Sequence, residues 1–214
     1  MDKNDRYIPA LGHERLTPLY DPLLRWIIRE SRFKTRLVEQ AHVEAGQRVL
    51  DLGCGTGTLT ILVKQAHPEA EVIGLDGDRA VLEIARAKAA KADVAVSWTP
   101  GMAFQLPYAD NSFDRILSGL VFHHLTTENK RRTFREIFRV LRPGGELHVA
   151  DFGRPHNAGA YFISLLVGRF EEATANVRGL LPEMFREAGL SRVAETDRFM
   201  TVVGTISLYE ARRS

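Results

Sequence analysis

The chain has 214 residues, enough to bury the core of one domain, and its 29 lysines and arginines nearly balance its 27 acidic residues. A formal charge of +2 is too small to imply nucleic acid as a partner. The single cysteine, Cys54, excludes an internal disulfide and a zinc site built from cysteines, and it fits a reducing compartment. We find neither a signal peptide nor an apolar stretch of the ~20 residues that a membrane span needs. The expectation is a cytoplasmic protein without a bound metal.

The first 45 residues are expected to form an arm and a helix that cap the functional site of the domain in residues 46–214. The helix is predicted from Leu23 to Ala41, with an apolar face toward the domain and a basic face, including Lys34, toward solvent. A basic amphipathic helix can also lie on an anionic membrane surface. Two roles of this helix therefore stay open, namely peripheral contact with a membrane and simple packing on the domain.

A buried strand followed by a glycine-rich turn is predicted in the sequence V-L-D-L-G-C-G-T-G, from Val49 to Gly57. Gly53, Gly55 and Gly57 permit backbone angles and a close ligand approach that a Cβ atom would block. A helix is predicted from Thr58, and its free N–H groups would favour a carboxylate or phosphate at the turn. The spacing lacks the third glycine of a dinucleotide-binding turn and the lysine of a phosphate-binding P-loop.

Alternating strands and helices are predicted after this turn. Asp76 ends a buried strand roughly 20 residues further on, where Rossmann-like folds hold a ribose diol. Asp78 is expected to cap the next helix, and Thr126 or Thr127 a later one. The remaining predicted segments are strands at 94–98, 113–118, 146–151, 193–199 and 201–209, a loop at 99–112 and a helix at 182–188 that ends before Gly189. These segments predict an α/β fold, a doubly wound, mainly parallel seven-stranded sheet with a C-terminal antiparallel strand pair.

The pattern D-x-G-x-G-x-G at 51–57 resembles the first motif of the class I S-adenosylmethionine-dependent methyltransferases. The words L-P-Y at 106–108, L-R-P-G-G at 141–145 and D-F-G-R-P at 151–155 are similar to those of the ubiquinone and menaquinone biosynthesis methyltransferases, the type 11 branch. The resemblance covers about residues 46–212 and implies a Rossmann-like methyltransferase fold with S-adenosylmethionine as cofactor.

The resemblance also implies which residues contact the parts of the cofactor. The amino-acid half would lie at the glycine loop, the ribose at an acidic side chain, the adenine at the loop after the third strand and the methionine part near the fourth strand. The implied contacts are Asp51, Gly53, Gly55, Gly57 and Thr60, then Asp76, then Met102 and Ala103, then Ser118, with Tyr20 closing over the site.

Two positions depart from the family pattern at the adenine. Met102 stands where many relatives have an acidic residue that accepts from the adenine amino group, and Gly77 stands where many have a bulky apolar residue. Methionine is a pliable apolar filler, so Met102 would occupy the space that Gly77 leaves. The alternative is that Met102 is only a core residue.

Candidates for proton transfer follow the fourth and fifth strands. His123 and His124 would lie at the crevice, where a histidine can take a proton near neutral pH. Asp151 and Arg154 would border the same crevice and orient an acceptor. The alternative for the histidines is structural, with one hydrogen-bonded in place and the other solvated.

The predicted function is transfer of a methyl group to a small, lipophilic acceptor by in-line displacement. The lipophilic character depends on the apolar run at 161–167, which can also be an ordinary buried helix. Two alternatives are methylation of a phospholipid headgroup at a membrane surface and a non-catalytic domain that kept the fold. Nucleic acid is not expected as a substrate, because no N/D-P-P-Y/F motif and no long basic cluster occur. The acceptor and the oligomeric state are left open.

Overall fold

The computed structural model describes residues 30–155, 174–201 and 204–214. Its strands are β1 (Arg48–Leu52), β2 (Glu71–Asp76), β3 (Ser97–Pro100), β4 (Phe113–Gly119), β5 (Leu141–Phe152), β6 (Ser191–Thr201) and β7 (Gly204–Arg212). Its helices are α2 (Glu30–Gln40), α3 (Thr58–Ala66), α4 (Arg79–Lys91), the 3-10 helix η3 (Phe122–His124), α5 (Thr127–Val140), α7 (Thr174–Val177) and α8 (Leu181–Glu187).

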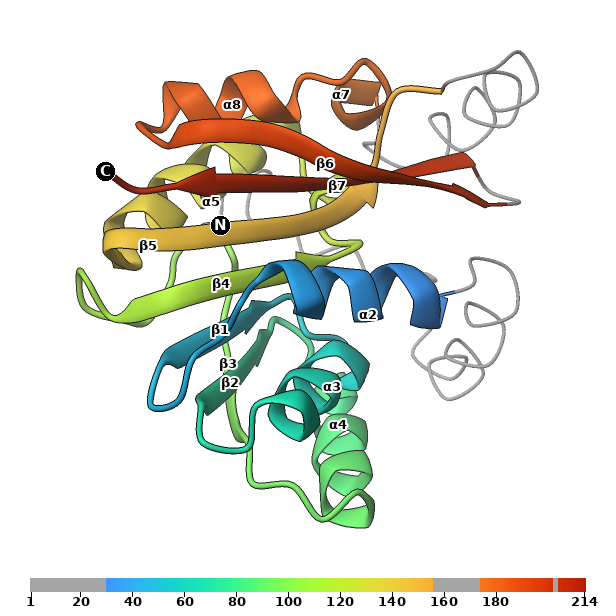
Figure 1. The fold of residues 1–214 in the computed structure, drawn as a ribbon, viewed down its shortest axis with the longest axis vertical. Coiled ribbons are helices and arrows are strands. Elements are labelled where there is room, and N and C mark those ends of the chain that lie inside the picture. Colours follow the sequence, from blue (N-terminus) through green and yellow to red (C-terminus); the bar gives the residue numbers. More distant parts are fainter. Residues whose placement is uncertain (1–29, 156–173, 202–203) are drawn as a thin grey trace.

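The strands form one sheet of seven in the order β3-β2-β1-β4-β5-β7-β6 (Figure 1). The first five run parallel, whereas β7 pairs antiparallel with both β5 and β6, as the sequence predicts. The register aligns Leu52 with Leu75, and Ser118 with Val149. The carboxyl ends of β1, β2, β4 and β5 therefore meet at one edge of the sheet, where open α/β sheets bind their ligands.

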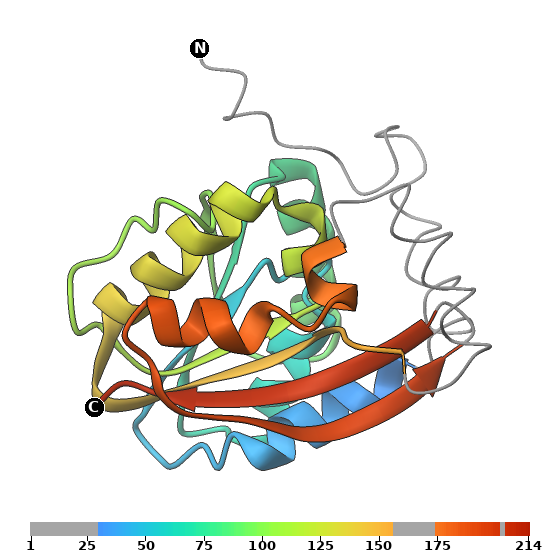
Figure 2. The ribbon, with the colours of Figure 1, turned by 90° about the horizontal axis from the view of Figure 1, so that it is seen from above.

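Helices cover both faces of the sheet and bury a separate apolar cluster on each (Figure 2). On one face, Phe134 of α5 and Phe185 of α8 pack edge to face, with ring centroids 4.7 Å apart. On the other face, Phe33 of α2 and Leu59 of α3 pack against strand residues such as Val49. Successive strand residues point to opposite faces, so each inner strand serves both clusters.

Several predicted boundaries are confirmed. Asp78 caps α4, because its carboxylate accepts from the backbone N–H of Ala80 at 2.8 Å. Thr126 caps α5 in the same way, through the N–H of Asn129. Gly189 follows α8 with φ of +97°, the left-handed geometry typical of a residue just beyond a helix end.

Several predicted strand starts differ from the structure; the last strand, for example, begins at Gly204, and Thr201 belongs to β6. The third strand begins at Ser97, because Asp93 adopts φ of +54° and the N–H of Val94 bonds back to Ala89 at the end of α4. The fifth strand begins at Leu141, because that residue already pairs with Phe113 before the register shifts. The residues R-P-G-G at 142–145 thus form an irregularity inside β5 instead of preceding it.

The N-terminal helix is described from Glu30 to Gln40, and this part belongs to the core of the domain. Phe33 and Leu37 are fully buried against the sheet. Lys34, predicted on the solvated face, is only 8% exposed, and that prediction is wrong. The expectation that the arm and helix of residues 1–45 cap the site stays a prediction, and residues 1–29 lie outside the described part.

Other expectations also fall on residues that lie outside the described ranges. They are the role of Tyr20 over the cofactor and the apolar run at 161–167. Within the described ranges, no helix has the length and apolar character to span a membrane. The same part of the chain holds no group of three or more side chains that could ligate a metal ion.

Candidate cofactor and acceptor site

Of the three glycines in the turn after β1, two are packed closely against side chains and one is not. Gly53, Gly55 and Gly57 have φ of +68°, +53° and +77°, which side chains rarely adopt. A Cβ atom on Gly53 would lie 2.4 Å from Cγ2 of Val121, and one on Gly57 would lie 2.6 Å from Cη2 of Trp98. No heavy atom lies within 4 Å of a Cβ position on Gly55. Gly53 and Gly57 permit close packing, and Gly55 leaves its outer side open for a ligand.

The backbone N–H groups of this turn are already used within the protein. Gly53 and Cys54 both donate to the carbonyl oxygen of Leu75, at 2.8 and 2.9 Å. Gly55 donates to Oδ2 of Asp76 at 2.9 Å, and Gly57 donates to the carbonyl oxygen of Cys54 at 2.9 Å. These four N–H groups thus already have partners, whereas the predicted anion site concerns the N–H groups of the helix that begins at Thr58.

Asp51, in β1, places its carboxylate at the start of the following helix, α3. Asp51 is only 1% exposed, and its Oδ2 accepts from the hydroxyl of Thr60 at 2.6 Å. The backbone N–H of Thr60 also bonds to this carboxylate. Burial raises the pKa of Asp51 to about 6, although the hydrogen bonds of Thr60 and the positive charge of Lys34 oppose that rise. A carboxylate of the protein thus satisfies the positive end of α3.

Asp76 ties the glycine turn to the end of β2. Its Oδ2 accepts from the N–H of Gly55, and its Oδ1 accepts from the N–H of Asp78 at 2.9 Å. The backbone N–H of Gly77 also bonds to this carboxylate, which has about four acceptor positions and so keeps capacity for a ribose hydroxyl. Burial raises the pKa of Asp76, against the backbone hydrogen bonds that lower it. Two carboxyl groups beside an open glycine fit a ligand that has a diol and a positive charge.

The end of β4 closes the other side of the turn. Ser118 is fully buried, and its hydroxyl donates to the carbonyl oxygen of Leu52 at 3.0 Å, so it joins β4 to β1. Leu120 adopts φ of +62°, a strained conformation for a bulky residue. This backbone conformation turns the chain so that Val121 faces Gly53. Such strain is concentrated at functional sites.

His123 and Asp151 form a buried dyad at this edge. Nδ1 of His123 lies 3.0 Å from Oδ1 of Asp151, and their side chains are 5% and 0% exposed. Asp151 also accepts from Nδ2 of Asn176 at 2.9 Å. Its further donors are the backbone N–H groups of Val121, Phe122 and Phe152. The surrounding donors orient Asp151 toward His123, so Asp151 can position the imidazole but does not itself face an acceptor.

Charge and packing distinguish the two histidines. Burial opposes ionisation of Asp151, yet the charge of His123 and the hydrogen bonds hold the pKa of this carboxyl below its ordinary value. His124 is half-buried, with its ring centroid 4.0 Å from that of His123. Burial, reinforced by the charge of His123, lowers the pKa of His124 to about 3, so this ring is neutral at physiological pH. Arg154 donates to the carbonyl oxygen of Arg178, away from the dyad.

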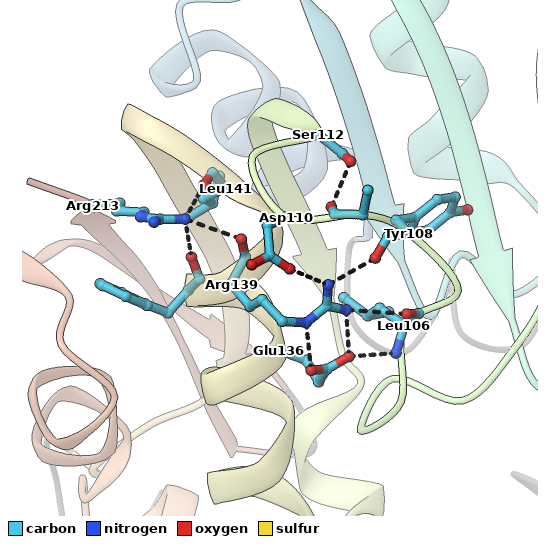
Figure 3. A network of polar contacts seen from close by, with 10 residues as sticks. Leu106, Tyr108, Asp110, Ser112, Glu136, Arg139, Leu141 and Arg213 are labelled. Atoms are coloured by element: carbon cyan, nitrogen blue, oxygen red, sulfur yellow. Dashed lines mark hydrogen bonds and ion pairs between the residues drawn. The ribbon is translucent and has the colours of Figure 1, made fainter.

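The loop after β3 is fixed by one arginine of α5 (Figure 3). Nη1 of Arg139 donates at 2.8 Å to the carbonyl oxygen of Tyr108 and to Asp110, and Nη2 reaches the carbonyl oxygen of Leu106. Glu136 pairs with the same guanidinium and accepts from the N–H of Leu106. The loop that carries the predicted adenine contacts is therefore held to α5.

Met102 starts a tight turn at the beginning of this loop. Its carbonyl oxygen accepts from the N–H of Gln105, and its side chain is half-buried. Ala103 packs against the larger apolar cluster, whereas Met102 is a member of neither described cluster. Its contact with adenine and the role of Gly77 stay predictions, beside the alternative in which Met102 is only a core residue.

The placement of three residues near the site escaped the sequence-based reasoning. Asn176 belongs to no motif, and only the fold brings it to Asp151. Trp98 fills the space that Gly57 and Gly74 leave free. Lys34 had a usable signal, since it precedes Leu37 and Val38 by three and four residues and so shares their helix face.

Comparison with known proteins gives a consistent family assignment. A family model described as a methyltransferase domain matches residues 49–145. A demethylmenaquinone methyltransferase from Listeria monocytogenes serotype 4a is 33% identical over 205 residues, which cover 84% of this chain and 86% of that protein.

Solved structures share the fold at lower identity. Phosphoethanolamine N-methyltransferase 2 from Haemonchus contortus, in complex with S-adenosyl-L-methionine, matches with a TM-score of 0.75 at 16% identity, over 95% of this chain and 58% of that one. The [4+2]-cyclase SpnF matches with a TM-score of 0.68 at 22% identity, over 85% of this chain and 80% of that one. Since a cyclase and a methyltransferase both match, the structural likeness identifies the fold and not the reaction.

Proposed function

This chain belongs to the class I S-adenosylmethionine-dependent methyltransferases of the quinone-biosynthesis type, and on that premise we propose that its acceptor is a reduced, lipophilic quinone. The cofactor supplies a methyl group that a sulfonium has already activated. The protein must then bind the two reactants, align them and remove the proton of the acceptor. The observation that carries the proposal is the buried His123–Asp151 dyad at the edge where the ligands of such sheets bind.

The glycine turn and the two carboxyl groups serve the cofactor in this proposal. Asp76 accepts from the ribose hydroxyls, and Gly55 leaves room for the ligand backbone to approach. Asp51 lies beneath the turn, where its negative charge favours a cationic ligand. Met102 contacts the adenine by apolar packing in place of a hydrogen bond.

The dyad serves the acceptor. A hydroquinone has a hydroxyl proton that must leave as the ring becomes nucleophilic, and an imidazole is suited to take it. Asp151 holds the ring through Nδ1 and stabilises the imidazolium that forms, the role of the acid in a catalytic triad. The ring electrons form the new bond to the methyl carbon while the carbon–sulfur bond breaks, and its electron pair stays on sulfur. The attacked ring carbon then loses its hydrogen as a proton to solvent, which restores the aromatic ring, and the imidazolium returns its proton to the ring oxygen.

A panel of acceptors tests the proposal. The purified protein is given S-adenosylmethionine with a demethylated naphthohydroquinone, a simple phenol, phosphoethanolamine, or vesicles containing phosphatidylethanolamine, and S-adenosylhomocysteine is measured. We expect turnover with the hydroquinone at least ten times faster than with the other acceptors. Faster turnover with phosphoethanolamine or the vesicles would replace the quinone by a headgroup acceptor. Turnover with none of the four would contradict the proposed acceptor class.

A further inference from the structure

Two ammonium groups approach the glycine turn from different helices. Lys34, on α2, is 8% exposed, and its Cε lies 3.9 Å from the position that a Cβ atom on Gly119 would take. Its charge acts on the carboxylate of Asp51. The N-terminal end of α2 lies at the edge where β4 and β5 end (Figure 1). Lys34 thus brings a buried positive charge to the carboxyl ends of β1 and β4.

The second ammonium group, that of Lys88, contacts hydroxyl groups of the turn. Nζ of Lys88, on α4, lies 3.1 Å from Oγ1 of Thr56 and 2.9 Å from Oγ1 of Thr58. These hydroxyls belong to the outer part of the turn and the first residue of α3. Lys88 therefore stabilises the turn where it meets α4, whereas Lys34 lies beside β4.

The cofactor brings a carboxylate to a region where several backbone donors already have partners in the protein. The N–H groups of Gly53, Cys54, Gly55 and Gly57 donate within the protein. The N–H of Thr60 is bonded to Asp51, so the start of α3 already has its anion. Asp51 and Asp76 both carry or can carry negative charge, which would repel a third carboxylate nearby. A cation at this turn would offset that repulsion.

We propose that Lys34 binds the carboxylate of the amino-acid part of S-adenosylmethionine. The inference depends on the placement of that part at the glycine turn, which the proposed function includes. Lys34, on α2, would pair with the carboxylate of the cofactor, and the negative charge of Asp51 would favour its ammonium and sulfonium groups. Each charge of the amino-acid part would then have a partner of opposite sign. The contact would also select the intact cofactor against forms that lack the carboxylate.

Calorimetric binding tests the contact without any need for turnover. The parent and Lys34→Met are titrated with S-adenosylmethionine and with its decarboxylated form, and thermal unfolding checks that both proteins are folded. In the parent we expect the decarboxylated form to bind about 10- to 100-fold more weakly, the value of one charge-assisted hydrogen bond. In Lys34→Met this ratio should fall to about one, and Lys34→Arg should restore part of it.

Two matched variants separate the contact from general charge effects. Arg36→Met removes an exposed cation on the same helix that pairs with Glu39 and Asp197, and it should keep the parental ratio. Lys88→Met should lower the affinity for both ligands by the same factor, or change neither affinity. A ratio that persists in Lys34→Met, or that disappears in Lys88→Met instead, would overturn the inference. If the parent binds neither form, the proposed cofactor site itself is wrong. If Lys34→Met unfolds, Lys34→Arg decides. It must still bind the decarboxylated form more weakly than the intact cofactor.

Discussion

Replacing Asp51 by asparagine should change how the stability of the protein depends on pH. Burial raises the pKa of Asp51 from 3.8 to about 6, so the folded state holds this proton more tightly than the unfolded state does. The difference of about 2.2 units corresponds to about 3 kcal/mol of unfolding free energy lost at neutral pH. The loss develops as the pH rises through the window from about 4 to 6, and it is absent below both pKa values.

Asp51→Asn removes this titration and keeps an oxygen that accepts from the hydroxyl of Thr60. Relative to the parent, the variant should gain about 2 kcal/mol of unfolding free energy between pH 4.5 and pH 7.5. Urea denaturation followed by circular dichroism at several pH values measures that difference. Comparing two pH values in one variant cancels the constant cost of the new amide group.

Asp114→Asn provides the matched control. Burial acts to raise the pKa of Asp114, but the N–H of Arg48 and the guanidinium of Arg142 lower it overall, so its titration lies below this pH window. The unfolding free energies of this variant and the parent should run parallel from pH 4.5 to pH 7.5. If Asp51→Asn also runs parallel to the parent, the buried carboxyl is not ionised at the expected cost, and the reasoning about Asp51 is refuted.

Three further changes have defined outcomes. Gly57→Ala should lower the unfolding free energy by about 2 kcal/mol more than Gly55→Ala, because its methyl group meets Trp98, and equal losses in urea denaturation would contradict the packing. Asp151→Asn should slow methyl transfer by about 100-fold or more and change its pH profile, with cofactor affinity in calorimetry unchanged, whereas an unaltered rate would exclude the dyad. Met102→Asp should sharpen the preference for the adenine cofactor over its inosine analogue, and a parent that already rejects the analogue strongly would exclude the adenine contact.

The central strands and the glycine turn could be predicted from the sequence because their signals are local. The apolar run before Gly53 and the alternation of strands and helices needed no tertiary information. The start of β3 could not be found in this way, since Val94 has the character of a strand residue and yet its N–H closes the end of α4. A hydrogen bond to the preceding helix outweighed the propensity for a strand.

The site was predicted less completely than the fold. The predicted strands placed Asp76 and His123 near their carboxyl ends, where the structure finds them. Asp151 was expected to orient an acceptor, and the structure surrounds it with backbone donors and with Asn176, which the sequence alone does not place beside it. Lys34 shows the opposite case, in which the helical spacing held the information and the charge of the residue obscured it.

The most direct test of the account is methyl transfer from S-adenosylmethionine that carries a trideuterated methyl group. The protein is incubated with a demethylated naphthoquinone in either its reduced or its oxidised form, and the product is analysed by mass spectrometry. The account predicts a labelled methyl group on the reduced form alone, because only the hydroquinone has a proton for His123 to remove and a ring rich enough in electrons to attack. Equal labelling of the oxidised form, or none of the reduced form while the cofactor is bound, would contradict it.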